Sequence, residues 1–100
     1  MIIPLETVSH QTFIPFIDQV FTVSISQFVS QLQLKSVQLL GHKHPDASRD
    51  PFSLTFRGPT ELSLAQGIYQ FYCEGLGEME FFITQIAAGS RDSEFEAVFT

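Results

Sequence analysis

The sequence predicts an all-β fold class, mostly β with one short N-terminal helix, built as a small antiparallel barrel or a two-layer sandwich of six or seven strands. Apolar and polar residues alternate with a period of two over several short segments, which is typical of strands with one buried face. The chain has 11 Phe and 2 Tyr but no Trp, and such residues favour pleated surfaces that pack together. Its 100 residues suffice for one core, and no linker or repeat divides them, so we expect residues 1–100 to form a single domain.

Residues 9–17 predict one or two helical turns. Phe13, Phe16 and Ile17 have the i, i+3, i+4 spacing of a helix with one apolar face. Ser9 is the expected N-cap, and Pro15 should keep the helix short.

The first two strands are expected at residues 20–25 and 29–40. In the first, apolar residues alternate with Thr and Ser. In the second, Leu32 and Leu34 are out of phase with the apolar residues that follow, so we expect a bulge or bend near Ser36.

A polar segment rich in turn-forming residues, 41–51, predicts the longest loop. Residues 52–57 then alternate as a strand that faces the core, and Gly58 and Pro59 end it. A second loop should follow before the chain re-enters the sheet at Gln66.

The last third of the chain predicts a three-stranded meander. Residues 69–74 and 79–83 alternate on either side of Gly75-Leu76-Gly77, the pattern of a β-hairpin. A turn at 88–93 precedes a third alternating segment, residues 95–99.

Charge and cysteine content exclude several classes of partner. Five basic residues stand against eleven acidic ones, giving a formal net charge of -6, so we expect no nucleic-acid partner. The single cysteine, Cys73, cannot form an intramolecular disulfide, and no apolar run approaches the about 18 residues of a membrane span. Residues 1–6 lack the basic region of a secretion signal. A cytoplasmic protein with no membrane partner is the expectation.

One cluster has residue types that bind metals: His42 and His44, with Asp46 and Asp50 nearby. Against a metal site, Lys43 places a cation between the two histidines, and no further Cys or His lies where it could complete a four-ligand zinc site. We expect a solvated loop, without a metal or a cofactor.

Nucleophilic catalysis is not predicted. Cys73 is in phase with inward Phe71, and a buried thiol has a raised pKa and low reactivity. No serine lies in a Gly-x-Ser-x-Gly turn, and His10 has no carboxylate at a suggestive spacing. We expect the meander's carboxylates on its solvent faces, and therefore a protein that is not an enzyme; they are Glu74, Glu78, Glu80, Glu94 and Glu96.

Two further groups of residues have expected roles. Arg57 ends an apolar strand, where a guanidinium can pair with Glu94 or Glu96 on a neighbouring strand; we expect a structural ion pair, with Glu96 as the named partner. Apolar side chains on otherwise polar strand faces predict a second packing layer or a partner surface, and these are Tyr72, Phe82 and Val98.

Short motifs occupy the second half of the chain, at residues 52–59, 66–69, 76–77, 81–83 and 95–99. They resemble, in this order, the F-S-L-x-F-x-G-P, Q-G-x-Y and L-G motifs, a Phe-led hydrophobic run and the Y-E-A-V-F motif of a family of small bacterial domains of unknown function. The resemblance covers residues 52–99 well and the N-terminal half only by pattern. It departs from the family where Phe95 replaces the usual tyrosine, and where Asp18 replaces a glycine and has to adopt a left-handed turn.

The resemblance also implies a context. Members of the family are encoded beside proteins similar to phage tail-collar proteins, which implies an accessory or assembly protein of a tail-like particle. No catalytic or binding residue carries over from the family.

The function expected from the sequence is a non-enzymatic protein-interaction or assembly module that binds a protein partner or itself. The alternative is a small-molecule-binding β-barrel, since a Phe-rich barrel can hold an apolar ligand in its mouth. A cupin-like metal enzyme centred on His42 and His44 would need ligands that the sequence does not offer.

Overall fold

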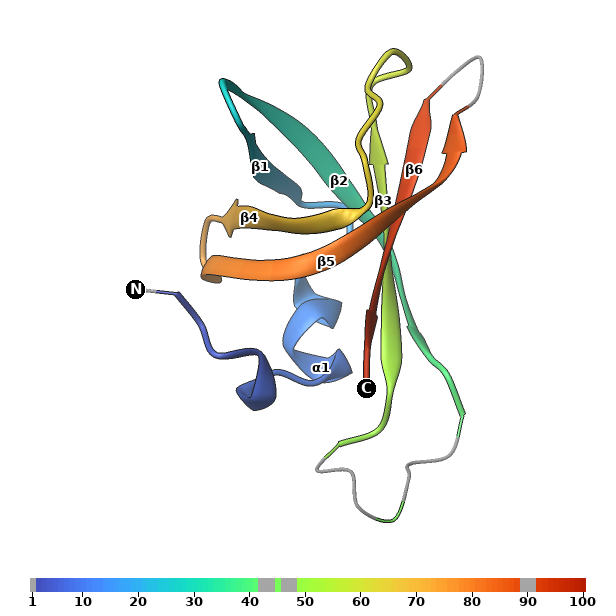
Figure 1. Cartoon of the computed structure of the whole chain (residues 1–100). Coiled ribbons are helices and arrows are strands. Elements are labelled where there is room, and N and C mark those ends of the chain that lie inside the picture. The colour runs from blue at the N-terminus through green and yellow to red at the C-terminus, as the bar shows by residue number, and fades with distance from the viewer. Residues whose placement is uncertain (1, 42–44, 46–48, 89–91) are drawn as a thin grey trace.

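The computed structural model describes residues 2–41, 45, 49–88 and 92–100, and its six strands form a closed antiparallel barrel (Figure 1). The order of strands around the barrel is β1-β2-β3-β6-β5-β4. The strands are β1 (Val20–Ile25), β2 (Phe28–Leu39), β3 (Phe52–Gly58), β4 (Gly67–Cys73), β5 (Gly77–Ala88) and β6 (Ser93–Phe99). The fold class is confirmed, and of the two predicted architectures the barrel is the one formed.

The N-terminal segment forms three short helical turns, η1 (Leu5–Thr7), α1 (His10–Phe13) and η2 (Ile14–Phe16). Ser9 is the N-cap of α1, and its backbone N–H donates to Thr12 Oγ1 at 3.0 Å. Pro15 lies in η2, so the α-helix ends one turn after it begins. The predicted short helix and its cap are confirmed.

The phase change in the second strand is a bulge, as predicted. The pairing of β2 with β3 shifts register between Leu34 and Ser36, which lets residues on both sides of the shift point into one barrel.

Just before β1, Asp18 has a φ of 74°, so the left-handed turn expected at this position is confirmed. Lys35 Nζ lies 3.0 Å from Asp18 Oδ1 and ties this turn to β2.

The core consists mainly of the inward residues of all six strands, joined by Val8, Phe13 and Leu64 from outside the strands. Their alternation is strict in β6, where Ser93, Phe95, Ala97 and Phe99 are buried and the residues between them are half-buried or exposed. The largest fully buried side chains are Phe13, Phe21, Phe52, Phe56, Phe71, Phe95, Leu32, Leu34, Leu54, Met79, Ile83 and Val23. Burial of these aromatic rings is the main source of stability for a domain of this size.

The N-terminal segment closes one end of the barrel. Phe13 is fully buried there, with its ring centroid 5.9 Å from that of Phe52 and 5.7 Å from that of Phe99. Figure 1 shows α1 below the strands at this end. The helical turns therefore act as a plug that extends the core beyond the strands.

Arg49 fastens this plug. Its guanidinium donates hydrogen bonds to the backbone carbonyls of Leu5 and Val8, the second at 2.7 Å, and its centre lies 5.7 Å from the ring centroids of both Phe52 and Phe99. One side chain thus satisfies two carbonyls of the N-terminal segment and stacks on the end of the core.

The segment between β3 and β4 closes the opposite end. Leu64 is 8% exposed and covers the core, and Gln85 fixes the segment by accepting from the Leu64 N–H at 2.9 Å and donating to the Leu62 carbonyl at 3.1 Å. Buried Ser93 donates to the same Leu62 carbonyl at 2.8 Å. Gln85 precedes a register shift between β5 and β6, which marks the place where the sheet departs from regular pairing.

Candidate interaction surface

The inside of the barrel is filled by its own aromatic side chains. Phe71 and Phe81 stack with centroids 4.1 Å apart, and Phe56 lies 5.6 Å from Phe71 and 5.3 Å from Phe21. Each of these rings is at most 3% exposed. These buried rings therefore pack against one another across the centre of the barrel.

The three residues predicted to form a partner surface all face outward. Tyr72 is 48% exposed, Phe82 is 50% exposed and Val98 is 53% exposed. They lie on β4, β5 and β6, so the surface belongs to the C-terminal meander. Half-exposed aromatic and aliphatic side chains on three neighbouring strands are typical of interaction surfaces.

Strand register shows which of these residues lie close together. Phe82 is directly opposite Ile68, which is 71% exposed, so these two side chains are cross-strand neighbours. Tyr72 lies opposite Glu78. It is four residues beyond Ile68 along β4, which places it about 13 Å from Ile68 at the rise per residue of a strand. The apolar surface therefore has its centre at Ile68 and Phe82, and Tyr72 lies at its edge.

Ile68 was not among the predicted surface residues, although the sequence contains a signal for it. Tyr69 is in phase with inward Phe71 and Cys73, and it is half-buried against the core in the structure. Because neighbouring residues of a strand face opposite sides, an inward Tyr69 places Ile68 outside. The same reasoning places Val29 outside, because it is out of phase with buried Leu32 and Leu34; it is 64% exposed and belongs to a second apolar site.

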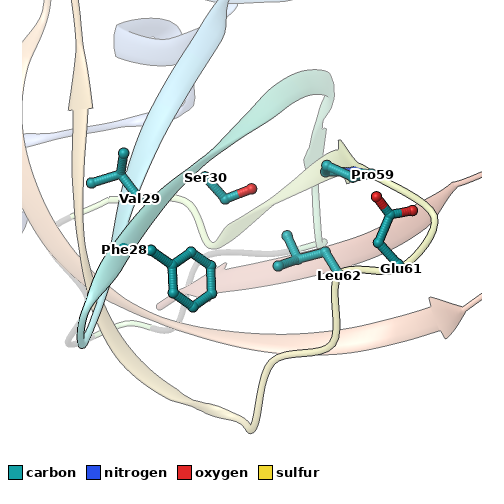
Figure 2. Close-up of a pocket in the computed structure, with 6 residues that line it drawn as sticks. All are labelled: Phe28, Val29, Ser30, Pro59, Glu61 and Leu62. Carbon is teal, nitrogen blue, oxygen red and sulfur yellow. The ribbon is translucent and has the colours of Figure 1, made fainter.

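That second site is a pocket of about 370 Å³ at the rim of the barrel. It is lined by Phe28, Val29 and Ser30 of β2 and by Pro59, Glu61 and Leu62 of the segment after β3. Figure 2 shows the side chains of Phe28 and Leu62 pointing toward one another, with the Glu61 carboxylate beyond Leu62. The pocket lies outside the filled interior.

The surface of the meander is acidic. Glu78, Glu80, Glu94 and Glu96 are half-buried or exposed on β5 and β6, and neither strand contains a lysine or an arginine. Gln70 Nε2 lies 3.5 Å from Glu78 Oε2. A partner of complementary charge would be basic.

Arg57 forms an ion pair with Asp92, with Nε 3.0 Å from Oδ2, whereas we expected Glu96 as its partner. In the register of β3 and β6, Arg57 lies opposite Glu94, and Glu96 lies opposite Thr55. Asp92 directly precedes β6, where its carboxylate reaches the guanidinium from beside the strand. Both partners are partly exposed, so the pair contributes little to stability.

Cys73 lies on the inward face, as predicted, and is 2% exposed. Desolvation by burial, with a smaller contribution from the nearby Glu74 carboxylate, raises the pKa of the thiol above its ordinary value of 9.0. The thiolate is the reactive form, so this cysteine is a poor nucleophile at neutral pH.

His42, His44 and Asp46 lie outside the described residues. Among the residues that are described, no group of three or more His, Cys, Asp and Glu side chains is placed to hold a metal ion. His10 is half-buried in the plug, as the first residue of α1, with its ring centroid 6.5 Å from that of Phe52.

The fold and the surface define a class: a small closed antiparallel β-barrel domain with a filled interior and an apolar, acidic outer face. The chain belongs to a family described as a domain of unknown function (DUF6916), whose model matches residues 8–99. Comparison with curated proteins and with solved structures found no match. No helix in the described part of the chain is long and apolar enough to span a membrane.

Proposed function

We propose that this domain is a non-enzymatic protein-interaction or assembly module that binds through the outer face of its C-terminal meander. The observation that carries the proposal is the pair Ile68 and Phe82, two large apolar side chains that are neighbours on the outside of a barrel whose inside is full. Tyr72 and Val98 extend this apolar surface on either side.

The physical reason is the cost of keeping this surface in water. Apolar area removed from water stabilises a complex by about 25 cal/mol per Å², and aromatic residues are enriched among the side chains that dominate binding. The carboxylates around the surface would attract a basic partner and exclude acidic ones. A structural component of a phage-tail-like particle is the specific partner we propose, on the resemblance of the motifs.

Affinity capture from the native host tests this proposal. The wild-type domain is compared with the triple variant Tyr72→Ser, Phe82→Ser, Val98→Ser and with the control Ile14→Ser, which changes a side chain of similar exposure (48%) on the N-terminal plug. We expect wild type and control to retain a discrete partner that the triple variant loses. Capture that is equal for all three proteins contradicts the proposal.

Self-association is tested in the same set of proteins by sedimentation velocity. If the partner is a second copy of the chain, wild type and the Ile14→Ser control sediment as an oligomer and the triple variant as a monomer. A wild-type monomer that also captures no partner from the host counts against the interaction function as a whole.

A second candidate function is binding of a small apolar molecule, and the rim pocket favours it. Its volume falls in the range of small-molecule sites, and Phe28 and Leu62 provide an apolar wall. Titration with the neutral dye Nile red tests this candidate. Fluorescence enhancement that is lost in Phe28→Ser supports the pocket as the site, and enhancement that is unchanged in this variant excludes it.

A further inference from the structure

β5 and β6 pair with each other along only part of their length, and we call the unpaired part the seam. The pairing of these strands runs from Thr84 opposite Glu96 to Ala88 opposite Ser93. Residues 77–83 of β5 pair with β4 on their other side, and residues 97–99 of β6 pair with β3. In Figure 1, β6 continues toward the end of the barrel that holds α1, whereas β5 runs away from it to the turn that joins β5 to β4.

The chain's own N-terminus occupies the beginning of this edge. Ile2 forms a parallel bridge with Glu78, and the Ile3 N–H donates to the Glu78 carbonyl at 2.8 Å. The segment leaves β5 at Pro4, the N-cap of η1. The edge of β5 therefore accepts an extended segment at Glu78, and the intramolecular segment goes no further along it.

Two residues of β5 continue this edge. Backbone N–H and C=O groups of alternate residues point to the same side of a strand, so those of Glu80 and Phe82 face the seam as those of Glu78 do. The register with β6 begins only at Thr84, so within the described chain neither residue has a strand partner on this side. Unpaired edges of this kind are templates for an added strand.

The side chains around the seam indicate the chemistry of the segment that would fit. Phe82 and Val98, each about half exposed, lie on its two sides. The carboxylates of Glu80 and Glu96 are on the same outer faces, and no hydrogen bond or ion pair ties either of them to another described side chain. The stem of a lysine or arginine can cover Phe82 while its charged end reaches a carboxylate.

We propose that the seam binds an extended, basic segment of a partner protein, which adds to β5 as a strand along Glu80 and Phe82. The inference rests on the proposed interaction function and gives it a binding mode, β-augmentation. Basic side chains of the segment face outward, over Phe82 and Val98 and toward Glu80 and Glu96.

Amide hydrogen exchange of the free domain tests the open edge. The N–H groups of Phe81 and Ile83 face β4 and should be protected, whereas those of Glu80 and Phe82 should exchange on the order of 100-fold faster. Equal protection of all four amides would show that the edge is already paired and would overturn the proposal.

A peptide titration followed by NMR tests the binding mode. The probe is acetyl-Lys-Val-Lys-Val-Lys-Val-amide, which should shift the amide resonances of Glu80 and Phe82 and slow their exchange. Two matched peptides are the controls: one with Glu in place of Lys, and one N-methylated at alternate residues, which keeps the side chains and removes backbone donors. Each should bind at least about tenfold more weakly. Equal binding of the N-methylated peptide overturns strand addition.

The variant Glu80→Lys separates the electrostatic contribution from the backbone. It should weaken binding of the lysine peptide and strengthen binding of the glutamate peptide, because it reverses the charge beside the edge of β5 and leaves the backbone in place. If neither peptide binds while the triple variant described above still loses a captured partner, strand addition is wrong and the interaction surface stands. If both experiments fail, both proposals are wrong.

Discussion

The rings of Phe71 and Phe81 stack face to face inside the barrel, with centroids 4.1 Å apart and planes 8° from parallel. They belong to neighbouring strands, and Phe56 lies against both of them from the opposite wall of the barrel, at 5.6 and 6.1 Å. This contact joins β3, β4 and β5 across the centre of the molecule, so packing of the aromatic core stabilises the barrel in addition to the pairing of its strands.

Substitution Phe81→Ala should lower the free energy of unfolding by about 3–5 kcal/mol, because it removes a buried ring and leaves a cavity. The neighbouring Phe82→Ala is a matched control, since that ring is half exposed and its loss should cost about 0.5 kcal/mol or less. Urea unfolding of the two variants measures the difference. Equal losses at the two positions would contradict the assignment of inward and outward faces.

Ser93→Ala should destabilise the domain by about 0.5–1.5 kcal/mol, the net contribution of one hydrogen bond, because Gln85 still donates to the Leu62 carbonyl. The Ser93 hydroxyl is fully buried and donates a hydrogen bond to the Leu62 carbonyl. Removing the hydroxyl removes one of the donors to this carbonyl. Amide exchange at Leu64 should accelerate as the segment over the barrel end loosens. The exposed Ser24→Ala is the control, and a result for Ser93→Ala that matches this control would refute the role given to the hydroxyl.

Arg49→Ala should release the N-terminal plug. Two charge-assisted hydrogen bonds to Leu5 and Val8 are lost, at a cost of about 1.5–3 kcal/mol for a bond of this kind, and amide exchange at Ile3 and Val8 should accelerate. Arg49→Lys keeps the charge but not the planar fork, so it should recover only part of the loss.

The control for Arg49 is Arg57→Ala, which removes a partly exposed ion pair and should cost less than about 1 kcal/mol. Amide exchange of the N-terminal segment at the same rate in Arg49→Ala as in wild type would refute the role given to Arg49.

Burial of the Cys73 thiol should make the free energy of unfolding depend on pH in the alkaline range. Because burial raises the thiol pKa in the folded state, the unfolded chain ionises first, near the ordinary value of 9.0, and stability should fall as pH rises from there through the folded pKa. Below the unfolded pKa the contribution is fully present. Urea unfolding of wild type and Cys73→Ala across this range isolates the effect, which should be absent from the variant; parallel curves would mean that the thiol is not desolvated.

The sequence predicted the strands well because side chains in a strand alternate with a period of two. The bulge near Ser36 followed from the phase change, and the left-handed turn at Asp18 from the family pattern. Barrel closure did not follow, because it depends on the pairing of β1 with β4 and of β3 with β6, which are distant in the chain. Local patterns carry no information about such pairings.

The candidate site was predicted only in part. Tyr72, Phe82 and Val98 followed from their place on polar strand faces, but the neighbour Ile68 depends on the register of β4 with β5. The true partner of Arg57 depends on where Asp92 lies relative to β3, which is again a long-range relationship. Arg49 could not be predicted to fasten the plug, since its contacts are some 40 residues away in the sequence.

Site-specific photo-crosslinking in the native host tests the central claim most directly. A photoreactive phenylalanine analogue is placed at Phe82, on the meander, and in a second protein at Ile14, which is equally exposed on the plug. We predict that position 82 crosslinks to one discrete protein, or to a second copy of this chain, and that position 14 does not. Crosslinks of equal yield and pattern from both positions, or none from position 82, would contradict a partner surface on the meander.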